Sequence, residues 1–166
     1  MKINLDPVIE IIVFTGPESS GKTTCALKTA QEFQLPLVEE YAREYLSIHG
    51  PTYTLSDIEN IAHKQIEMES EAHNLHPLIL CDTDIVTLDI WALEKYGSSL
   101  NISDPLCLKK YYFLCNPDIP WEPDPLRENP DDRDRLFDIY HSYLQKMNVP
   151  FTILNASDRT SLSLNW

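Results

Sequence analysis

An octapeptide near the start of the chain, Gly16-Pro17-Glu18-Ser19-Ser20-Gly21-Lys22-Thr23, matches the pattern G-x-x-x-x-G-K-[ST] at every position. It follows an apolar, β-branched run at residues 9–15 and opens a helix-favouring segment at residues 22–33. A buried strand, a glycine-rich turn and a helix in this order form the context in which the pattern binds phosphate. The alternative is a glycine turn that only connects strand to helix, and the complete match makes it the weaker one.

Each residue type in this octapeptide suits a triphosphate. Successive backbone N–H groups from Glu18 to Thr23, together with the N-terminus of the following helix, offer partial positive charge to phosphate oxygens. Gly16 and Gly21 allow backbone angles and close approaches that a Cβ atom would block. We expect Lys22 to reach the β- and γ-phosphates and the Thr23 hydroxyl to bind Mg²⁺.

Strand-like and helix-like segments alternate along the rest of the chain. We expect strands at residues 9–15, 37–39, 78–81, 111–115 and 151–154, and helices at residues 22–33, 58–68, 84–96 and 131–147. Ser56 and Glu59 have the spacing of a capping box before the second helix. The alternation predicts an α/β fold, with a parallel sheet covered by helices on both faces. The 166 residues suffice for a single domain, 1–166.

Acidic residues outnumber basic ones, with 26 Asp and Glu against 13 Lys and Arg, which gives a net charge of −13 at pH 7. This charge repels nucleic-acid backbones and anionic lipid, so we expect neither nucleic acid nor membrane as a partner. No signal-peptide pattern precedes the first strand and no apolar run approaches the ~18 residues of a membrane span, which predicts a cytoplasmic protein. The four irregularly spaced cysteines are expected to be reduced and buried. Whether the chain forms a homo-oligomer stays open.

Acidic residues follow two of the predicted strands, at the sheet edge where open parallel sheets bind ligands. Asp82 directly follows residues 78–81 and is expected to hold Mg²⁺ through water. Asp84 is either a substrate or metal contact or the N-cap of the next helix. Glu40 follows residues 37–39 and could accept the proton of a hydroxyl that attacks the γ-phosphate, or could be a solvated charge at a helix start.

A lid is predicted at about residues 116–135, a segment with five prolines that is long for a connection in a compact domain. Arg127, Arg133 and Arg135 lie within it. A lid that brings an arginine to the transferring phosphoryl group would exclude water and stabilise developing charge. Aspartates flank these arginines between residues 131 and 134, so surface ion pairs are the alternative.

Four stretches together resemble the NadR-type ribosylnicotinamide kinases, a branch of the P-loop kinases related to thymidylate and deoxynucleoside kinases. They are residues 14–24, Glu40-Tyr41-Ala42-Arg43-Glu44-Tyr45, Cys81-Asp82-Thr83-Asp84, and residues 117–127 with the Pro-Trp pair at 120 and 121. They occur in family order and span nearly the whole chain. The phosphate loop belongs to a very large superfamily, whereas the second and fourth stretches are much more particular.

The resemblance implies a P-loop NTPase fold with an adenylate-kinase-like strand order, 2-3-1-4-5. It also implies transfer of the ATP γ-phosphate to the 5′-hydroxyl of nicotinamide riboside, which gives nicotinamide mononucleotide for NAD synthesis. The implied catalytic residues are Lys22, Glu40, Asp82 and Arg127, with Thr23 and Asp82 as Mg²⁺ ligands, and with Tyr41, Arg43 and Asp84 in the riboside pocket. The ATP contacts are expected from Gly16, Glu18, Ser19, Ser20, Gly21, Lys22, Thr23, Thr24 and Arg133.

One position departs from the family pattern. Bifunctional members tend to carry a tryptophan just before the Glu-Tyr pair, suited to stacking on the nicotinamide ring, and this chain has Glu39 there. A flat surface for the acceptor would then come from Trp121 or a nearby tyrosine, unless these aromatics pack in the core. The alternative function is a nucleotide-binding regulatory ATPase module without small-molecule kinase activity. Chain length and charge argue against regulation by direct DNA binding.

Overall fold

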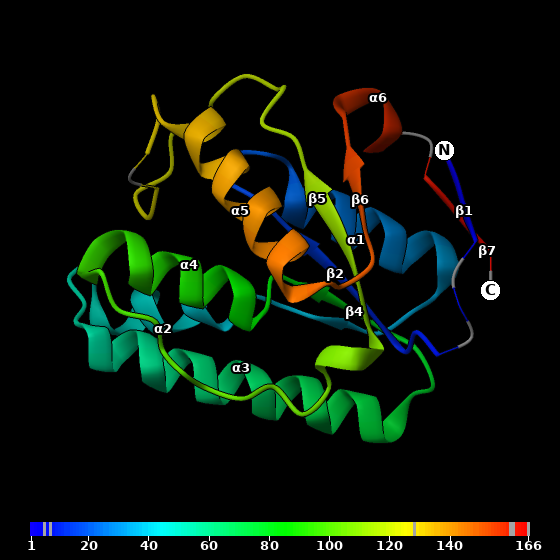
Figure 1. Cartoon of the computed structure of the whole chain (residues 1–166), viewed down its shortest axis with the longest axis horizontal. Helices are drawn as coiled ribbons and strands as arrows, with labels where there is room; N and C mark the ends of the chain where they lie inside the picture. Colours follow the sequence, from blue (N-terminus) through cyan, green and yellow to red (C-terminus); the bar gives the residue numbers. More distant parts are fainter. Residues whose placement is uncertain (5, 7, 128, 160–161, 166) are drawn as a thin grey trace.

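The computed structural model of the chain describes residues 1–166 except 5, 7, 128, 160–161 and 166. Figure 1 shows a central sheet with helices on both of its faces. In chain order the elements are β1 (Lys2–Asn4), β2 (Ile11–Thr15), α1 (Lys22–Phe33), β3 (Leu37–Val38), α2 (Tyr41–His49), α3 (Leu55–Leu75), β4 (Ile79–Asp82), α4 (Ile85–Tyr96), the single-turn helix η1 (Cys107–Lys109), β5 (Lys110–Cys115), α5 (Arg133–Met147), β6 (Phe151–Leu154), α6 (Ala156–Arg159) and β7 (Ser163–Asn165).

The central sheet of the described chain has five parallel strands in the order β3-β4-β2-β5-β6. These are the five strands that the sequence predicts, and numbered among themselves they have the predicted order 2-3-1-4-5. β2 lies in the middle, with Ile11 opposite Ile79 of β4 on one side and Lys110 of β5 on the other. The octapeptide that follows β2 is therefore held at the centre of the sheet's carboxyl edge, and the predicted P-loop fold is confirmed.

Alternate residues of β2 face opposite layers, as the pleat of a strand requires. Ile12 and Phe14 belong to an apolar cluster with Ala26 of α1. Ile11 and Val13 belong to a second cluster, which includes Ile90 of α4 and Tyr140 of α5. In Figure 1 the helices α4 and α5 accordingly lie in front of the strands, and α1 lies behind them. A strand buried on both faces explains why residues 11–14 form an uninterrupted apolar run.

A third apolar cluster lies beside the sheet and joins α2, α3 and α4. Its buried members include Leu46 of α2, Ile58 of α3 and Leu88 of α4. Leu126, from the proline-rich loop between β5 and α5, packs against the same cluster. The loop is thereby attached to the helices beside the sheet as well as to β5 and α5, which it connects.

The structure differs from the expected elements in several places. Helix α3 is capped by Thr54, whose Oγ1 accepts a hydrogen bond from the Asp57 backbone N–H at 3.3 Å, while the Asp57 carboxylate accepts one from the Thr54 backbone N–H at 2.7 Å. The capping box predicted at Ser56 and Glu59 is therefore wrong by two residues, because the better pair starts earlier in the same polar run. Residues 41–49 form helix α2, and β1 pairs with β7 in a small parallel sheet that the sequence did not indicate.

None of the helices in the described ranges combines the length and apolar character needed to cross a membrane. Cys25, Cys81 and Cys115 are buried as predicted, while Cys107 is partly exposed.

Candidate active site

The octapeptide forms a tight loop between β2 and α1, as predicted. Gly16 has φ +131°, and a Cβ atom there would lie 2.7 Å from the carbonyl oxygen of Cys115, so only glycine fits. Gly21 also has a positive φ, 80°, directly before α1 begins at Lys22. The Lys22 Nζ atom donates a hydrogen bond to the carbonyl oxygen of Pro17 at 2.9 Å, which folds the ammonium group back into the loop.

A cleft of about 620 Å³ opens beside this loop. Its volume lies within the roughly 300–1,000 Å³ typical of small-molecule sites. The whole stretch from Gly16 to Thr24 lines one part of it, and α2, α4, α5 and the proline-rich loop supply the rest. The other lining residues are Glu40, Ala42, Arg43, Leu46, Thr87, Ile90, Trp91, Glu94, Lys95, Ile119, Glu122, Leu126, Arg127, Asn129, Arg135, Leu136 and Tyr140.

Asp82 ends β4 beside the helix that carries Thr23, and its side chain is buried. Burial raises the pKa of the Asp82 carboxyl, and a hydrogen bond with the Thr23 side chain and the charge of Lys22 oppose this rise. Within the described part of the chain, the buried Oδ1 atom has no hydrogen-bond partner. An unpartnered buried carboxylate oxygen next to a hydroxyl fits a hard cation such as Mg²⁺.

A metal site with many protein ligands is not found in the described part of the chain. Among the described residues, no group of three or more His, Cys, Asp or Glu side chains could hold a metal ion. Mg²⁺ characteristically takes few protein ligands and completes its octahedron with water and phosphate. The Asp82 carboxylate and the Thr23 hydroxyl, which are hydrogen-bonded to each other, are two oxygen donors of the kind Mg²⁺ takes.

Glu40 precedes α2 and lines the same cleft as Lys22. Burial raises the pKa of the Glu40 carboxyl above its usual 4.5, and the nearby Lys22 ammonium pulls in the opposite direction. The start of α2 is fixed in place because the backbone N–H of Tyr41 donates to Oε1 of the buried Gln65, on α3, at 3.0 Å. Glu40 thus lies half-buried in the cleft lining, directly before the fixed start of α2.

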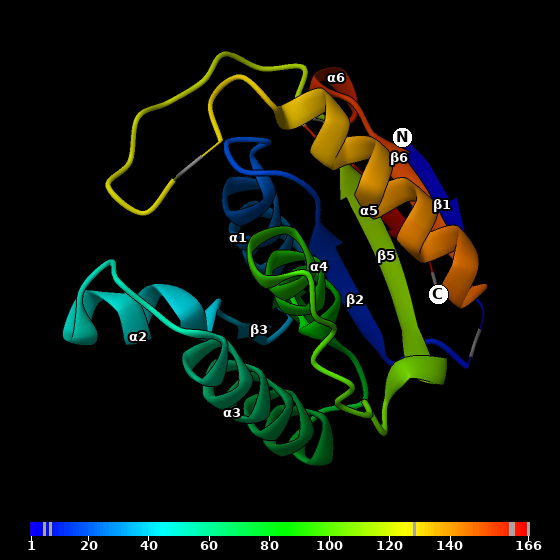
Figure 2. The ribbon, with the colours of Figure 1, turned by 60° about the vertical axis from the view of Figure 1, so that its left-hand side comes forward.

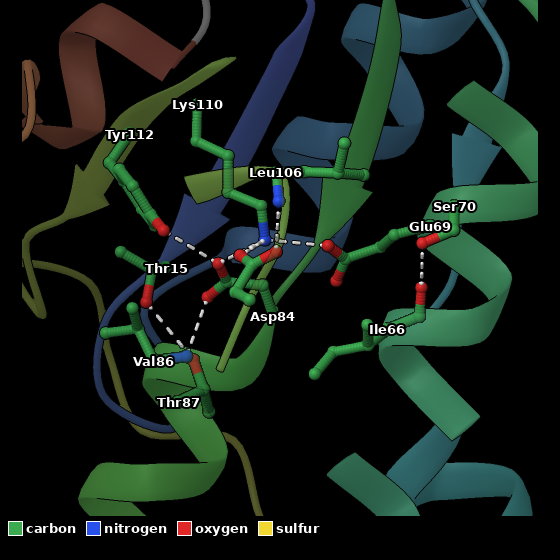
Figure 3. Close-up of polar contacts among 11 residues, drawn as sticks. Thr15, Ile66, Glu69, Ser70, Asp84, Val86, Thr87, Leu106, Lys110 and Tyr112 are labelled. Atoms are coloured by element: carbon green, nitrogen blue, oxygen red, sulfur yellow. Dashed lines mark hydrogen bonds and ion pairs between the residues drawn. The ribbon is translucent and has the colours of Figure 1, made fainter. Parts of the chain in front are cut away.

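Asp84 does not reach the cleft. Thr83 has φ +67°, and this left-handed residue turns the chain inward after β4. The Asp84 Oδ1 atom accepts a hydrogen bond from the Val86 backbone N–H at 3.0 Å, and Oδ2 accepts from Lys110 at 2.9 Å and from the Tyr112 hydroxyl at 2.8 Å. Figure 3 shows these contacts. Of the two roles predicted for Asp84, the structure shows the helix cap, and this corrects the placement in a riboside pocket.

Lys110, the partner of Asp84, is fully buried at the start of β5. Its Nζ atom also lies 2.7 Å from a Glu69 oxygen and 2.7 Å from an Asp104 oxygen. Burial alone would disfavour the ammonium, but the carboxylates of Asp84 and Glu69 hold the pKa of Lys110 above its usual value. Figure 3 shows Glu69 reaching this centre from α3, so the cluster ties α3 and α4 to the sheet.

The proline-rich loop lies over the octapeptide and contacts it at Ser19. The Glu122 backbone N–H donates to Ser19 Oγ at 2.9 Å, and Arg127 reaches the same oxygen at 3.4 Å. Arg133, at the start of α5, donates to the carbonyl oxygens of Ser19 at 3.1 Å and Ile119 at 3.0 Å. Figure 2 shows the loop extending outward beyond the end of the sheet, above α1. Both arginines predicted to serve the nucleotide therefore lie at the phosphate-binding loop.

Two further contacts attach the proline-rich loop. The Asn129 backbone N–H donates to the Glu18 carboxylate at 3.0 Å. Arg43 of α2 forms an ion pair with Asp124 of the loop at 3.0 Å, and this aspartate also accepts a hydrogen bond from the Leu126 backbone N–H. Arg43 thus contacts the loop and lines the cleft, whereas the sequence predicted only a pocket position for it.

Two residues predicted to contact substrate lie elsewhere. The Trp121 ring has the guanidinium carbons of Arg127 and Arg133 at 5.9 Å and 5.8 Å from its centroid, and it does not line the cleft. Tyr41 packs against the third apolar cluster, with its ring centroid 6.2 Å from that of Tyr45. The ion-pair alternative holds for Arg135, which contacts Asp132 and Glu94 at 2.6 Å and 2.5 Å.

Sequence reasoning missed the contribution of α4 and α5 to the cleft. Thr87, Ile90, Trp91 and Glu94 line it from α4, at the i, i+3, i+4, i+7 spacing of one helix face. That spacing is a signal in the sequence, although it does not tell which way the face points. Arg159 of α6 was missed as well, and it holds the base of the proline-rich loop by donating to the Asn116 carbonyl oxygen at 3.0 Å.

The glycine-rich octapeptide lies at the centre of a five-stranded parallel sheet, beside an aspartate that ends the neighbouring strand and under an arginine-bearing loop. Together they define a P-loop domain with an adenylate-kinase-like strand order. The AAA_28 family, described as an AAA domain, matches residues 11–161, and the chain belongs to this family.

The chain is similar in sequence and in fold to NadR. The trifunctional NAD biosynthesis/regulator protein NadR of Escherichia coli (strain K12) is 27% identical over 165 residues, which cover 92% of this chain and 40% of NadR. A crystal structure of NadR with NAD and AMP-PNP superimposes with a TM-score of 0.66 at 19% identity, over 90% of this chain and 45% of that one. Another, of NadR with NR, has a TM-score of 0.63 at 18% identity, over 89% and 46%. The chain thus spans less than half of NadR.

A shorter neighbour matches over nearly its full length. Thymidylate kinase from Ehrlichia chaffeensis has a TM-score of 0.57 at 17% identity, with 88% of this chain and 86% of that chain covered. The likeness extends the fold to a nucleotide kinase of similar size.

Proposed function

We propose that the chain is an ATP-dependent kinase that transfers the γ-phosphate to the 5′-hydroxyl of nicotinamide riboside or a related nucleoside. The observation that carries the proposal is that Glu40 and Lys22 line one cleft, so a proton acceptor and a phosphate-binding cation face the same space. NadR is named for NAD biosynthesis, and NadR structures hold NR, or NAD with AMP-PNP. These ligands support a nucleoside and ATP as the two substrates.

The transfer uses the residues of the cleft in distinct roles. The acceptor oxygen forms a bond to the γ-phosphorus, the bond from that phosphorus to the β–γ bridging oxygen breaks, and ADP leaves. The hydroxyl proton passes to the carboxylate of Glu40, whose pKa is raised by burial above its usual 4.5. Lys22 leaves the Pro17 carbonyl and binds the β- and γ-phosphates, as a preorganised charge beside the transferred group.

Magnesium fits the same site. The Thr23 hydroxyl and the Asp82 carboxylate would hold Mg²⁺, since the Asp82 Oδ1 atom is buried with no hydrogen-bond partner in the described part of the chain. When bound, the ion neutralises charge on the phosphates. ATP would lie on residues 16–24, with their backbone N–H groups directed at its phosphates.

The proline-rich loop acts as a lid in this proposal. Its arginines already contact Ser19 in the phosphate-binding loop, so a short movement brings Arg127 or Arg133 to a phosphoryl group. An arginine at that place stabilises charge that develops during transfer, and a closed lid keeps water from competing with the acceptor. Leu126 and Asp124 link the lid to the acceptor side of the cleft.

Product analysis tests the proposal. The protein is incubated with ATP, Mg²⁺ and a panel of nucleosides that includes nicotinamide riboside, thymidine, adenosine and cytidine, and products are identified by chromatography and mass spectrometry. We expect a nucleoside 5′-monophosphate from at least one member, formed far more slowly by Glu40→Gln. The matched control is Glu44→Gln, an exposed glutamate on α2 outside the cleft lining. A folded protein that phosphorylates none of the panel would refute the proposal.

A nucleotide-binding regulatory module is the second candidate. The contacts between the lid and Ser19 favour it, because they couple the phosphate-binding loop to an exposed segment that a partner protein could bind. Tight binding of ATP together with no nucleoside-stimulated turnover would select this function over the kinase.

A further inference from the structure

The part of the cleft beyond Glu40 has an apolar character, unlike the phosphate-binding part. Ala42 and Leu46 of α2, Ile90 and Trp91 of α4, and Leu126 of the lid line it. Trp91 and Leu126 both pack against the third apolar cluster, which therefore supports both side chains. A region of this kind suits the ring of a ligand better than its ribose or phosphate.

Trp91 is held in a fixed orientation. Its Nε1–H donates to the Tyr53 hydroxyl at 2.8 Å, and the two ring centroids lie 4.7 Å apart at an interplanar angle of 60°. Tyr53 is itself held, because its backbone carbonyl accepts a hydrogen bond from the Tyr96 hydroxyl at 2.6 Å. The indole N–H already has an acceptor, so Trp91 contributes to a ligand through the surface of its ring rather than by donating a hydrogen bond.

The helix that carries Trp91 is anchored at its start. The Asp84 carboxylate caps α4 and also binds the buried Lys110 and Tyr112 of β5, as Figure 3 shows. Trp91 lies two turns further along this helix. A side chain on an anchored helix, with its polar atom bonded, is preorganised for recognition and loses little freedom when a ligand binds.

We propose that Trp91 determines acceptor recognition by stacking on the planar base of the nucleoside. The inference rests on the proposed function, because it concerns the acceptor end of the same cleft. It replaces the aromatic sources that the sequence suggested, since neither Trp121 nor Tyr41 lines the cleft and Glu39 is exposed. An indole face can stack on any flat heterocycle, so the stacking selects nucleosides as a class over ribose without a base.

Binding measurements test this inference without any need for turnover. Dissociation constants are measured by calorimetry, in the presence of Mg²⁺ and AMP-PNP, for nicotinamide riboside, uridine and free ribose. The variants are Trp91→Leu, which removes the ring, and Trp91→Phe, which keeps a smaller one. The control is Leu93→Ala, a truncation on the more exposed side of α4, outside the cleft lining.

We expect Trp91→Leu to weaken binding of the tighter-binding nucleoside by roughly five- to tenfold, the fold-change of a lost ring contact. Trp91→Phe should weaken it about twofold, while AMP-PNP binding and the Leu93→Ala variant stay within about twofold of wild type. Unchanged nucleoside binding in a folded Trp91→Leu variant would overturn the inference. An equal loss of AMP-PNP affinity would also overturn it, because it would indicate a structural role.

Fluorescence provides a second readout, which compares the wild-type protein with the Trp91→Phe variant. Nucleoside binding should change the indole emission of the wild-type protein, and that change should vanish in Trp91→Phe. An emission change that persists in this variant would contradict stacking on Trp91. Wild-type protein that binds nucleosides through Trp91 yet phosphorylates none would refute the proposed function and leave this inference standing. Wild-type protein that binds no nucleoside would refute both.

Discussion

The Glu122 backbone N–H donates a hydrogen bond of 2.9 Å to Ser19 Oγ, and 103 positions separate the two residues in the sequence. This bond joins the proline-rich loop to the middle of the phosphate-binding loop. Ser19 has φ +52°, an uncommon value for a residue other than glycine, which places its hydroxyl group and its carbonyl group within reach of the loop. The position of the proline-rich loop is therefore coupled to the conformation of a residue that ATP is expected to contact.

Removal of this bond should loosen the lid. In Ser19→Ala the Glu122 N–H and Arg127 lose a shared acceptor, so we expect limited proteolysis within residues 116–132 to become several-fold faster while the remaining chain stays resistant. The matched control is Ser47→Ala, an exposed serine on α2 whose hydroxyl donates to the Glu44 carbonyl of its own helix. Equal cleavage rates in the Ser19 variant and wild type would show that the bond does not hold the lid.

Lys22→Ala should abolish most turnover and leave the fold intact. The ammonium group contacts the Pro17 carbonyl at the surface of the loop, so its loss creates no core cavity. We expect a fall in kcat of at least about 100-fold, as when a preorganised charge at a reacting group is removed. Steady-state kinetics measure the fall, and thermal melting checks the fold. Lys28→Ala, on an exposed position of α1, serves as the control, and wild-type rates in Lys22→Ala would place the phosphates elsewhere.

Glu40 should produce an acidic limb in the pH profile of kcat. A base must be ionised to accept a proton, so activity falls as pH drops through its pKa, and burial raises that pKa above 4.5. Glu40→Gln should lower kcat by roughly 10²- to 10⁴-fold, remove this limb and leave the KM for ATP within a few-fold of wild type. A large rise in the ATP KM, with the limb retained, would assign Glu40 to nucleotide binding instead.

Glu69 should make stability depend on pH. Burial raises its pKa from 4.5 to about 7 in the folded protein. Between these values the unfolded chain ionises first, so the free energy of unfolding decreases as pH rises from 4.5 to about 7. Chemical unfolding at pH 5 and pH 8 measures this loss, which Glu69→Gln should largely remove. Glu67→Gln, an exposed neighbour on α3, is the control, and an unchanged slope in Glu69→Gln would exclude Glu69 as its source.

The sequence predicted the parts of this protein that depend on local patterns. The five buried strands are short apolar runs, and Gly16 and Gly21 occupy turns whose backbone angles favour glycine. Asp82 and the arginines Arg127 and Arg133 contact residues of the octapeptide, which the sequence places at the same edge of the sheet.

Long-range contacts explain what the sequence did not reveal. Nothing near Asp84 indicates that Lys110, 26 residues further along, is buried against it, so the helix cap could not be preferred over a substrate contact. Trp91 was missed because it belongs to a predominantly apolar helix, where a core position is the ordinary expectation. Its partner Tyr53 lies 38 residues away, before α3 begins, and only the packing of α3 against α4 brings them together.

Phosphorus NMR of the wild-type protein with ATP, Mg²⁺ and the best-binding nucleoside tests the central claim most directly. We predict that the γ-phosphate resonance of ATP declines in step with the appearance of a phosphomonoester resonance coupled to the 5′-methylene protons of the nucleoside. Inorganic phosphate as the only new signal, formed at the same rate with and without nucleoside, would contradict the assignment of this chain as a nucleoside kinase.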